Sequence, residues 1–429
     1  MKILISDGLA QKGIDLLSSV SEFEVEFRPG LSAAELKSAV SDTEALVIRS
    51  GTKVTADVIA SASKLRVIGR AGIGLDNVDI AAASKRGIVV MNTPDGNVIT
   101  TAEHTVAMLM ALSRNIHQAT TSMKAGQWEK KKFLGQEVYH KTLGIIGVGR
   151  IGRIVADRAA GLRMHVIAYD PHLEPETIQK LGVVAVDLNE LYQRSDYISV
   201  HTPLTRDTKG LLNHEAFAKM KEGVMIINCA RGGIVNEQDL YEAITSGKVA
   251  GAALDVFEQE PPGDHPLLKL GQVICTPHLG ASTGEAQENV AVAIAEQIKE
   301  FLLAGGIRNA VNTPQISCEL MSEICHYLTL AERLGSFLGQ ITQGAMKEVT
   351  IEYRGGVAHL DTEPITLAAL QGLLEPILQH EVNYVNAPIL AKERGIVVKD
   401  SRSEEAQDYL NLITIQVRST AEDTLASGT

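Results

Sequence analysis

The stretch from Leu143 to Asp170 constrains the fold of this chain most strongly. It begins with a short apolar run that suits a buried parallel strand, and a glycine-rich turn with Gly147, Gly149 and Gly152 follows. Apolar residues at helical spacing come next, and a second apolar run ends at Asp170. A GxGxxG pattern alone is weak, but here it lies between a strand and a helix, with an acidic residue about 20 positions on. This context predicts a βαβ unit that binds a dinucleotide.

Each residue of this motif has a physical task. Gly147 permits the tight turn, Gly149 lets the backbone approach a pyrophosphate, and Gly152 lets the helix pack on the strand. The pyrophosphate would bind the free N–H groups at the start of the helix, near Arg150. Asp170 would accept hydrogen bonds from the ribose hydroxyls and repel a 2'-phosphate, so the expected cofactor is NAD.

Composition narrows the classes of protein. The chain has 429 residues, of which 45% are hydrophobic and 21% charged, so it can form two or three domains. A net charge of −12, with no basic block longer than Lys130–Lys132, argues against a nucleic-acid or membrane partner. The N-terminus lacks the order of a signal peptide, and the cysteines form no CxxC pair. We therefore expect a cytoplasmic protein without a metal site.

The pattern of strands and helices predicts an α/β fold of three parts. Residues 1–98 and 284–308 would form a flavodoxin-like substrate-binding domain. Residues 99–283 would form a Rossmann-type, doubly wound nucleotide domain, which begins with one long helix at 99–124. A small C-terminal α/β accessory domain would occupy 309–429, with 305–317 as a linker.

Three polar residues follow predicted strands and suggest a reaction. A dehydrogenase acting on a 2-hydroxy acid needs a cation for the carboxylate, a base for the hydroxyl proton and a carboxylate that orients the base. Arg231, His278 and Glu260 are the fitting types. Each also has an ordinary interpretation: a surface ion pair, a capping or core histidine, and a loop carboxylate.

Several motifs resemble those of the D-isomer-specific 2-hydroxyacid dehydrogenases through nearly the whole chain. They are GRAGIGLDNVD, MNTPDGN, GVGRIG, NCARGGIV, ALDVFEQEPP and TPHLGAST. Within this family the chain is similar to members that oxidise D-3-phosphoglycerate with NAD at the start of L-serine biosynthesis. The resemblance implies that Arg231 binds the carboxylate and the reacting oxygen, that His278 takes the hydroxyl proton, and that Glu260 orients His278. It also implies a homodimer or a higher homo-oligomer, and no metal.

The resemblance further implies a set of cofactor contacts. In addition to the glycines, they are Ile73, Arg150, Ile151, Asp170, Thr202, Cys229, Ala230, Arg231, Asp255, His278, Leu279, Gly280 and Ala281. Ile73 occupies a position that is often Thr in relatives, so only its backbone amide is expected to serve. Asp255 would hold the nicotinamide amide, although a turn-forming role at the strand end stays open.

The substrate phosphate is expected to meet arginines of the first domain. Arg49 and Arg70 follow predicted strands, and their planar guanidinium groups suit phosphate. Asn97 would add a donor. Lys130 matches a position where relatives can carry an Arg that reaches the neighbouring subunit, but a solvated basic turn explains it equally well.

The C-terminal part resembles the intervening domain of long family members, through EYRGGVA and NAPILAKERGI. Lys392 and Arg394 there could bind an anion or simply lie on an exposed helix face. The sequence stops at ASGT, where such relatives continue into a serine-binding regulatory domain, so we expect serine feedback to be absent or weak.

Two alternatives stay open at this level. One is another D-2-hydroxyacid dehydrogenase, a hydroxypyruvate or glyoxylate reductase or a D-lactate dehydrogenase, which would share every motif. The other is an NAD-sensing, co-repressor-like binding protein, which turnover would exclude.

Overall fold

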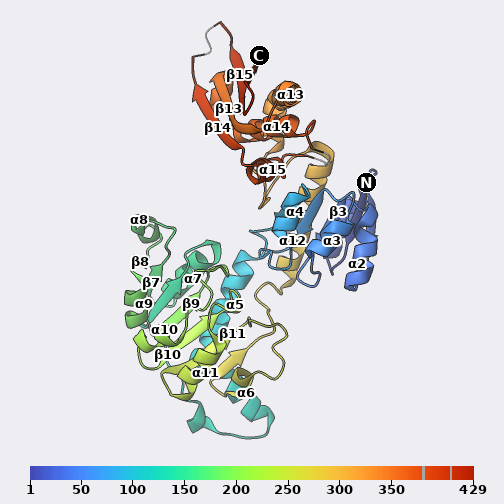
Figure 1. Cartoon of the computed structure of the whole chain (residues 1–429). Helices are drawn as coiled ribbons and strands as arrows, with labels where there is room; N and C mark the ends of the chain where they lie inside the picture. The colour runs from blue at the N-terminus through green and yellow to red at the C-terminus, as the bar shows by residue number, and fades with distance from the viewer. Residues whose placement is uncertain (379–381, 406–407) are drawn as a thin grey trace. The chain divides into compact units, whose positions relative to one another are not determined.

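The computed structural model describes residues 1–378, 382–405 and 408–429, except for the side chain of Cys318. The chain divides into two compact units (Figure 1). The first comprises Met1–Gly96 with Gln287–Thr429, and the second comprises Asn97–Ala286. Within the described residues, no helix has the length and apolar character needed to cross a bilayer.

The first unit begins with a five-stranded parallel sheet in the order β2-β1-β3-β4-β5, the flavodoxin-like order. Its strands are β1 Lys2–Ile5, β2 Glu24–Phe27, β3 Ala45–Ile48, β4 Val67–Arg70 and β5 Val89–Asn92. Its helices are α1 Gln11–Ser18, α2 Ala33–Ala39, α3 Ala56–Ser61 and α4 Ile80–Lys85, with a 3₁₀ turn at Val40–Asp42. The long helix α12, Gly284–Ala304, buries Ile294 and Ile298 in the same core as strands β1 and β3. Helix and strand approach closely because β4 carries Gly69, where a Cβ would lie 2.8 Å from Ile294.

The segment 305–317 is not the free linker that its composition predicts. Ile307 and Ile316 pair in an antiparallel bridge and are both buried, and Ala310 forms a bridge with Met91 of β5. The segment therefore packs against the sheet, with Ile307 and Ile316 in its hydrophobic core. Its glycines mark only the end of α12, where Gly305 adopts a φ of 72°.

The second unit contains a seven-stranded parallel sheet in the order β12-β11-β10-β9-β6-β7-β8. Counted from β6, this is the Rossmann order, and the strand order reverses between β6 and β9. The strands are β6 Thr142–Ile146, β7 His165–Tyr169, β8 Val184–Ala185, β9 Tyr197–Val200, β10 Val224–Asn228, β11 Val249–Leu254 and β12 Val273–Cys275. The helices are α5 Val98–Ser113, α6 Ile116–Lys124, α7 Arg150–Gly161, α8 Pro175–Gln179, α9 Leu188–Arg194, α10 His214–Lys219 and α11 Glu237–Thr245, with 3₁₀ turns at Lys130–Phe133 and Pro266–Lys269. The predicted α/β class is confirmed.

The single long helix predicted at 99–124 is wrong. Helix α5 ends at Ser113, and α6 begins two residues after Arg114. Between them Asn115 has a φ of 51°, in the left-handed region, which Asn tolerates better than most residues. No Gly or Pro marks this break, so the sequence pattern could not reveal it.

The C-terminal part of the first unit has its own four-stranded mixed sheet in the order β14-β13-β15-β16. The strands are β13 Met346–Gly355, β14 Val397–Ser403, β15 Asn411–Ser419 and β16 Asp423–Gly428. The helices are α13 Cys318–Ile341, α14 Glu363–Leu374 and α15 Ala387–Glu393, with a 3₁₀ turn at Gly356–His359. Sequence reasoning missed β16, because this edge strand alternates exposed and half-buried residues and has no apolar run.

Candidate functional site

The glycine loop between β6 and α7 has the backbone that the dinucleotide motif requires. Gly147 has a φ of 93°, and a Cβ there would lie 2.8 Å from the carbonyl oxygen of His201. A Cβ on Gly152 would lie 2.1 Å from the carbonyl oxygen of Gly147. A Cβ on Gly149, by contrast, would have no atom within 4 Å. Two glycines thus serve close packing, and the third leaves open space against the backbone.

The groups around this loop fit a dinucleotide. Helix α7 begins after Gly149, which provides no side-chain cap, so its first turn presents N–H groups and a positive dipole end. The carboxylate of Asp170 accepts hydrogen bonds from Val148 N–H at 2.8 Å and His172 N–H at 3.0 Å. Each of its oxygens has a second acceptor site for a ribose hydroxyl. The hydroxyl of Thr202 is buried without a hydrogen-bond partner among the described residues.

The turn after β10 carries Cys229, Ala230 and Arg231. Asn228 shapes it, since its side chain accepts from Ala230 N–H at 3.0 Å and donates to Arg231 O at 2.9 Å. Nη1 of Arg231 donates to Ala230 O at 2.7 Å, and the side chain is half-buried. Burial raises the pKa of the Cys229 thiol to about 12, so this thiol stays protonated.

Asp255, directly after β11, is hydrogen-bonded to the loop that follows β12. Its carboxylate accepts from Thr276 Oγ1 at 2.6 Å, Leu279 N–H at 2.7 Å and Gly280 N–H at 2.8 Å. His104 of α5 lies 3.2 Å away. The side chain is fully buried, and burial alone would raise its pKa. The hydrogen bonds from its partners outweigh that effect and lower the pKa of Asp255.

Glu260 and His278 form the closest acid–base pair at these strand ends. Oε2 of Glu260 lies 2.7 Å from Nδ1 of His278, and Oε1 accepts from Phe257 N–H at 3.1 Å. His278 has a φ of 57°, and its N–H donates to Asp255 O at 2.9 Å. Burial would raise the pKa of Glu260, but the hydrogen bond and charge of His278 lower it. The side chain of Glu260 is 38% exposed and that of His278 is 46% exposed, so a small molecule can reach both.

Three of the predicted substrate and cofactor residues, Arg49, Arg70 and Ile73, belong to the first unit. They lie at the ends of neighbouring strands. Arg70 ends β4, and its Nε donates to the side chain of Asn77 at 3.1 Å. Asn77 in turn donates to the carbonyls of Arg49 at 2.7 Å and Thr52 at 2.6 Å. The carbonyl of Ile73 accepts from Asn92 at 2.6 Å. Asn77 therefore connects the guanidinium group of Arg70 to the backbone of Arg49.

The two other predicted substrate residues lie in the second unit. Asn97 precedes α5 and is buried, and its side-chain oxygen has no hydrogen-bond partner within the described parts of the chain. Lys130 is exposed in its short 3₁₀ turn.

Residues that organise the site escaped sequence reasoning. Asn77, His104, Asn228 and Thr276 all donate or accept within the networks described above. Asn77, Asn228 and Thr276 are polar residues in the motifs or directly after the strands, and that position is the only signal that could have identified them.

Comparison with known proteins identifies the class. Residues 106–280 match the D-isomer specific 2-hydroxyacid dehydrogenase, NAD binding domain. Residues 323–429 match the D-3-phosphoglycerate dehydrogenase intervening domain. A crystal structure of D-lactate dehydrogenase from Aquifex aeolicus, complexed with NAD and lactic acid, is 28% identical with a TM-score of 0.64, covering 73% of this chain and 100% of that one. The doubly wound fold, the glycine loop and these matches define an NAD-dependent oxidoreductase of the D-2-hydroxyacid class.

Full-length relatives narrow the class further. The D-3-phosphoglycerate dehydrogenase of Archaeoglobus fulgidus is 47% identical over 100% of this chain and 81% of its own length. That of Methanocaldococcus jannaschii is 48% identical over 98% of this chain and 80% of its own. The chain belongs to the D-3-phosphoglycerate dehydrogenase family.

Proposed function

We propose that this protein oxidises D-3-phosphoglycerate to 3-phosphohydroxypyruvate with NAD, in the cytoplasm, as the first step of L-serine biosynthesis. The observation that carries the proposal is the 2.7 Å contact between Glu260 and His278, at the strand ends of an NAD-binding domain. A histidine oriented by a carboxylate is the acid–base group that hydroxyl oxidation requires. Free thiols on Cys229, Cys275 and Cys325 are compatible with a reducing compartment.

The residues divide the chemistry among them. Bound NAD supplies the hydride acceptor. The side chain of Arg231 would bind the substrate carboxylate and the C2 oxygen, which holds C2 in place. His278 would take the hydroxyl proton on Nε2, because Nδ1 is engaged by Glu260. The carboxylate of Glu260 would then stabilise the imidazolium, and in the reverse direction the same proton returns to the carbonyl oxygen.

Most of the proposed cofactor contacts come from the second unit. The first turn of α7, with Arg150 and Ile151, would bind the pyrophosphate, while Asp170 and Thr202 would meet the adenosine half. The contacts near the nicotinamide would come from the chain at Cys229, Ala230, Leu279, Gly280 and Ala281, and Ile73 would add its backbone amide. Asp255 would act mainly through the loop that it holds, since four donors already surround its carboxylate.

Arg49 and Arg70 would bind the substrate phosphate, with Asn97 as a further hydrogen-bond donor. Arg49 follows β3 and Arg70 ends β4 of the same parallel sheet, and Asn77 connects the guanidinium group of Arg70 to the backbone carbonyl of Arg49. Arginine suits phosphate through paired hydrogen bonds. The same pair would have no partner on an unphosphorylated acid.

The experiment compares two oxidised substrates under NADH. We expect kcat/KM for 3-phosphohydroxypyruvate to exceed that for hydroxypyruvate by at least about a hundredfold, because two charge-assisted arginine–phosphate contacts are lost with the latter. A preference for hydroxypyruvate, glyoxylate or pyruvate would replace the proposal with the corresponding reductase. Absence of turnover with intact NAD binding would favour a binding protein.

The role of His278 has its own test. His278→Asn should lower kcat by about 10²- to 10⁴-fold while NAD binding, measured by protein fluorescence, stays intact. Turnover near the wild-type rate would exclude His278 as the acid–base group.

We further propose that the protein is a homodimer formed through the segment that follows α5. Large apolar side chains along this segment are exposed in the single chain: Ile116 52%, Met123 53%, Trp128 78%, Leu134 88% and Tyr139 57%. Such a concentration of apolar surface is typical of a contact between proteins. Lys130 lies in the same segment.

A further inference from the structure

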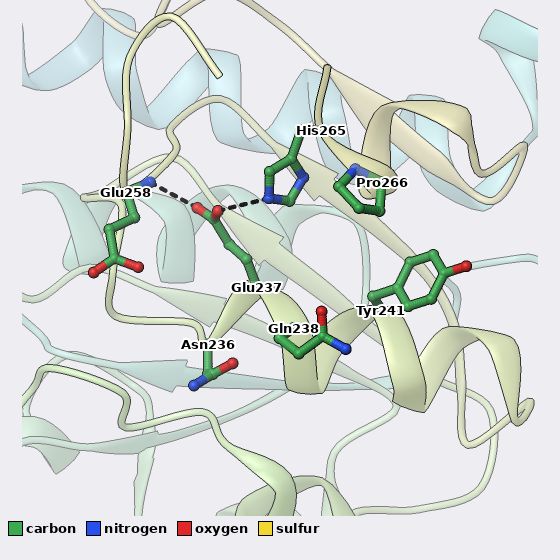
Figure 2. Close-up of a pocket in the computed structure, with 7 residues that line it drawn as sticks. All are labelled: Asn236, Glu237, Gln238, Tyr241, Glu258, His265 and Pro266. Atoms are coloured by element: carbon green, nitrogen blue, oxygen red, sulfur yellow. Dashed lines mark hydrogen bonds and ion pairs between the residues drawn. The ribbon is translucent and has the colours of Figure 1, made fainter. Parts of the chain in front are cut away.

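A polar hollow lies at the N-terminal end of α11, beside the loop that carries Glu260 (Figure 2). Its lining comes from the start of α11 on one side and from residues 258–266 on the other. Glu237, the first residue of α11, points into this hollow from the helix. Its side chain is only 15% exposed.

The carboxylate of Glu237 binds both ends of the loop 258–265. Oε1 accepts a hydrogen bond from Glu258 N–H at 2.6 Å, and Oε2 lies 3.0 Å from Nε2 of His265 (Figure 2). Nδ1 of His265 accepts from Leu267 N–H at 3.3 Å, so the donor proton of the neutral ring is on Nε2 and faces Glu237. The ring of His265 also meets that of Phe257 edge to face, with the centroids 5.8 Å apart. One carboxylate therefore closes an eight-residue loop.

This loop is the one that sets the position of Glu260. Phe257, directly before the Glu258 N–H that Glu237 binds, donates its own N–H to Oε1 of Glu260. The other oxygen, Oε2, contacts His278. Close packing fixes the same turn from another direction, because a Cβ on Gly232 would lie 1.9 Å from Phe257 O. A shift of the loop would therefore move the carboxylate away from His278.

We propose that Glu237 is a positioning residue for the reaction: by binding Glu258 N–H and His265, it holds Glu260 within hydrogen-bond distance of His278. This inference rests on the roles proposed above for Glu260 and His278. Glu237 itself is separated from the acid–base pair by the loop and acts through it.

The test is Glu237→Gln, assayed in the reductive direction across pH. An amide cannot accept at both ends, because its NH₂ group would face a donor. Misplacement of a catalytic group by about 1 Å can cost a hundredfold, so we expect kcat to fall about 10- to 100-fold with little change in KM. The alkaline limb of the pH profile should also move to lower pH, since a carboxylate held less closely favours the protonated imidazole less.

Two further variants separate positioning from general damage. Glu242→Gln makes the same chemical change on the same helix, where the carboxylate contacts Gln238, and should leave the profile unchanged. In a Glu260→Gln background, Glu237→Gln should add less than about a twofold loss, because there is no carboxylate left to position. The inference would be overturned if Glu237→Gln lowered kcat in the Glu260→Gln background as much as in the wild type. It would also be overturned if Glu237→Gln alone left the pH profile unshifted.

The outcomes also distinguish the two proposals. If Glu260→Gln shifts the pH profile and Glu237→Gln does not, only the inference about Glu237 is wrong. If Glu260→Gln leaves the profile unchanged, the role proposed for Glu260 is wrong and the inference fails with it.

Discussion

Single carboxylates at strand ends organise the loops of this site. Asp170 binds the N–H groups of Val148 and His172, and Asp255 binds those of Leu279 and Gly280. A charged acceptor on a backbone N–H forms a stronger hydrogen bond than a neutral one. These acids thus fix the conformation of both loops.

Asp255 should couple the stability of the nucleotide domain to acid pH. Its folded-state pKa is lowered below the ordinary value of 3.8, so its stabilising contribution is present above that pH and is lost as the pH falls through the folded-state pKa. We expect Asp255→Asn to lower the free energy of unfolding by about 3 kcal/mol at neutral pH, because one buried donor then faces an amide NH₂.

Calorimetric melting of the wild-type protein and of Asp255→Asn, down to about pH 3, would check this pH dependence. The difference between them should narrow at the acid end. Asp157→Asn, which alters an exposed ion pair with Arg158, is the control and should change stability by less than about 1 kcal/mol. A pH-independent difference for Asp255→Asn would contradict the linkage.

Asn77 should control the preference for a phosphorylated substrate. Its side chain accepts a hydrogen bond from the Arg70 guanidinium and donates one to the backbone carbonyl of Arg49, so Asn77→Ala removes a support of the Arg70 side chain and of the backbone at Arg49. We expect kcat/KM for 3-phosphohydroxypyruvate to fall about tenfold, with a smaller fall for hydroxypyruvate, as measured by NADH oxidation. An equal loss with both substrates would indicate general destabilisation instead.

Among the elements, helices α13 and α14 pack with their backbones unusually close. A Cβ on Gly335 would lie 2.2 Å from Ala369 O, and one on Gly372 would lie 1.9 Å from Glu332 O. Glycines on both helices therefore create the contact, and side chains such as Leu373 fill the space beside it. The core of the C-terminal part depends on this helix pair.

Gly372→Ala should consequently destabilise the C-terminal part. A methyl group at 1.9 Å from a carbonyl forces the helices apart, at a cost of about 2 kcal/mol. Limited proteolysis and denaturant unfolding would measure the loss. Gly161→Ala, at the end of α7 with no atom within 4 Å, is the matched control and should change stability by less than about 1 kcal/mol. Equal behaviour of the two variants would refute the packing argument.

For the whole molecule, the proposed homodimer makes a direct prediction. Light scattering after gel filtration should give about twice the chain mass of 46.1 kDa. Leu134→Asp places a charge on the exposed apolar segment and should shift the protein toward monomer. Leu410→Asp is a matched control, because Leu410 is 89% exposed in the C-terminal part, against 88% for Leu134. A dimer unaffected by Leu134→Asp would place the interface elsewhere.

The sequence alone determined the features that depend on local order. Alternating strands and helices predict parallel sheets, and the glycine motif from Gly147 to Gly152 predicts the turn, since its constraints act between neighbours in the chain. The motif also predicts Asp170 as the ribose contact, because it places an acidic residue at a known spacing. Similar local patterns located Arg231, Glu260 and His278 after their strands.

Only the tertiary structure decided how these groups are supported. Glu237 meets the N–H of Glu258, 21 residues away, and Asn77 meets the carbonyl of Arg49, 28 residues away. The bridge between Met91 and Ala310, which places the 305–317 segment on the sheet, spans more of the chain still. Such partners are chosen by the packing of whole elements, and no periodicity or motif within a short window contains that information.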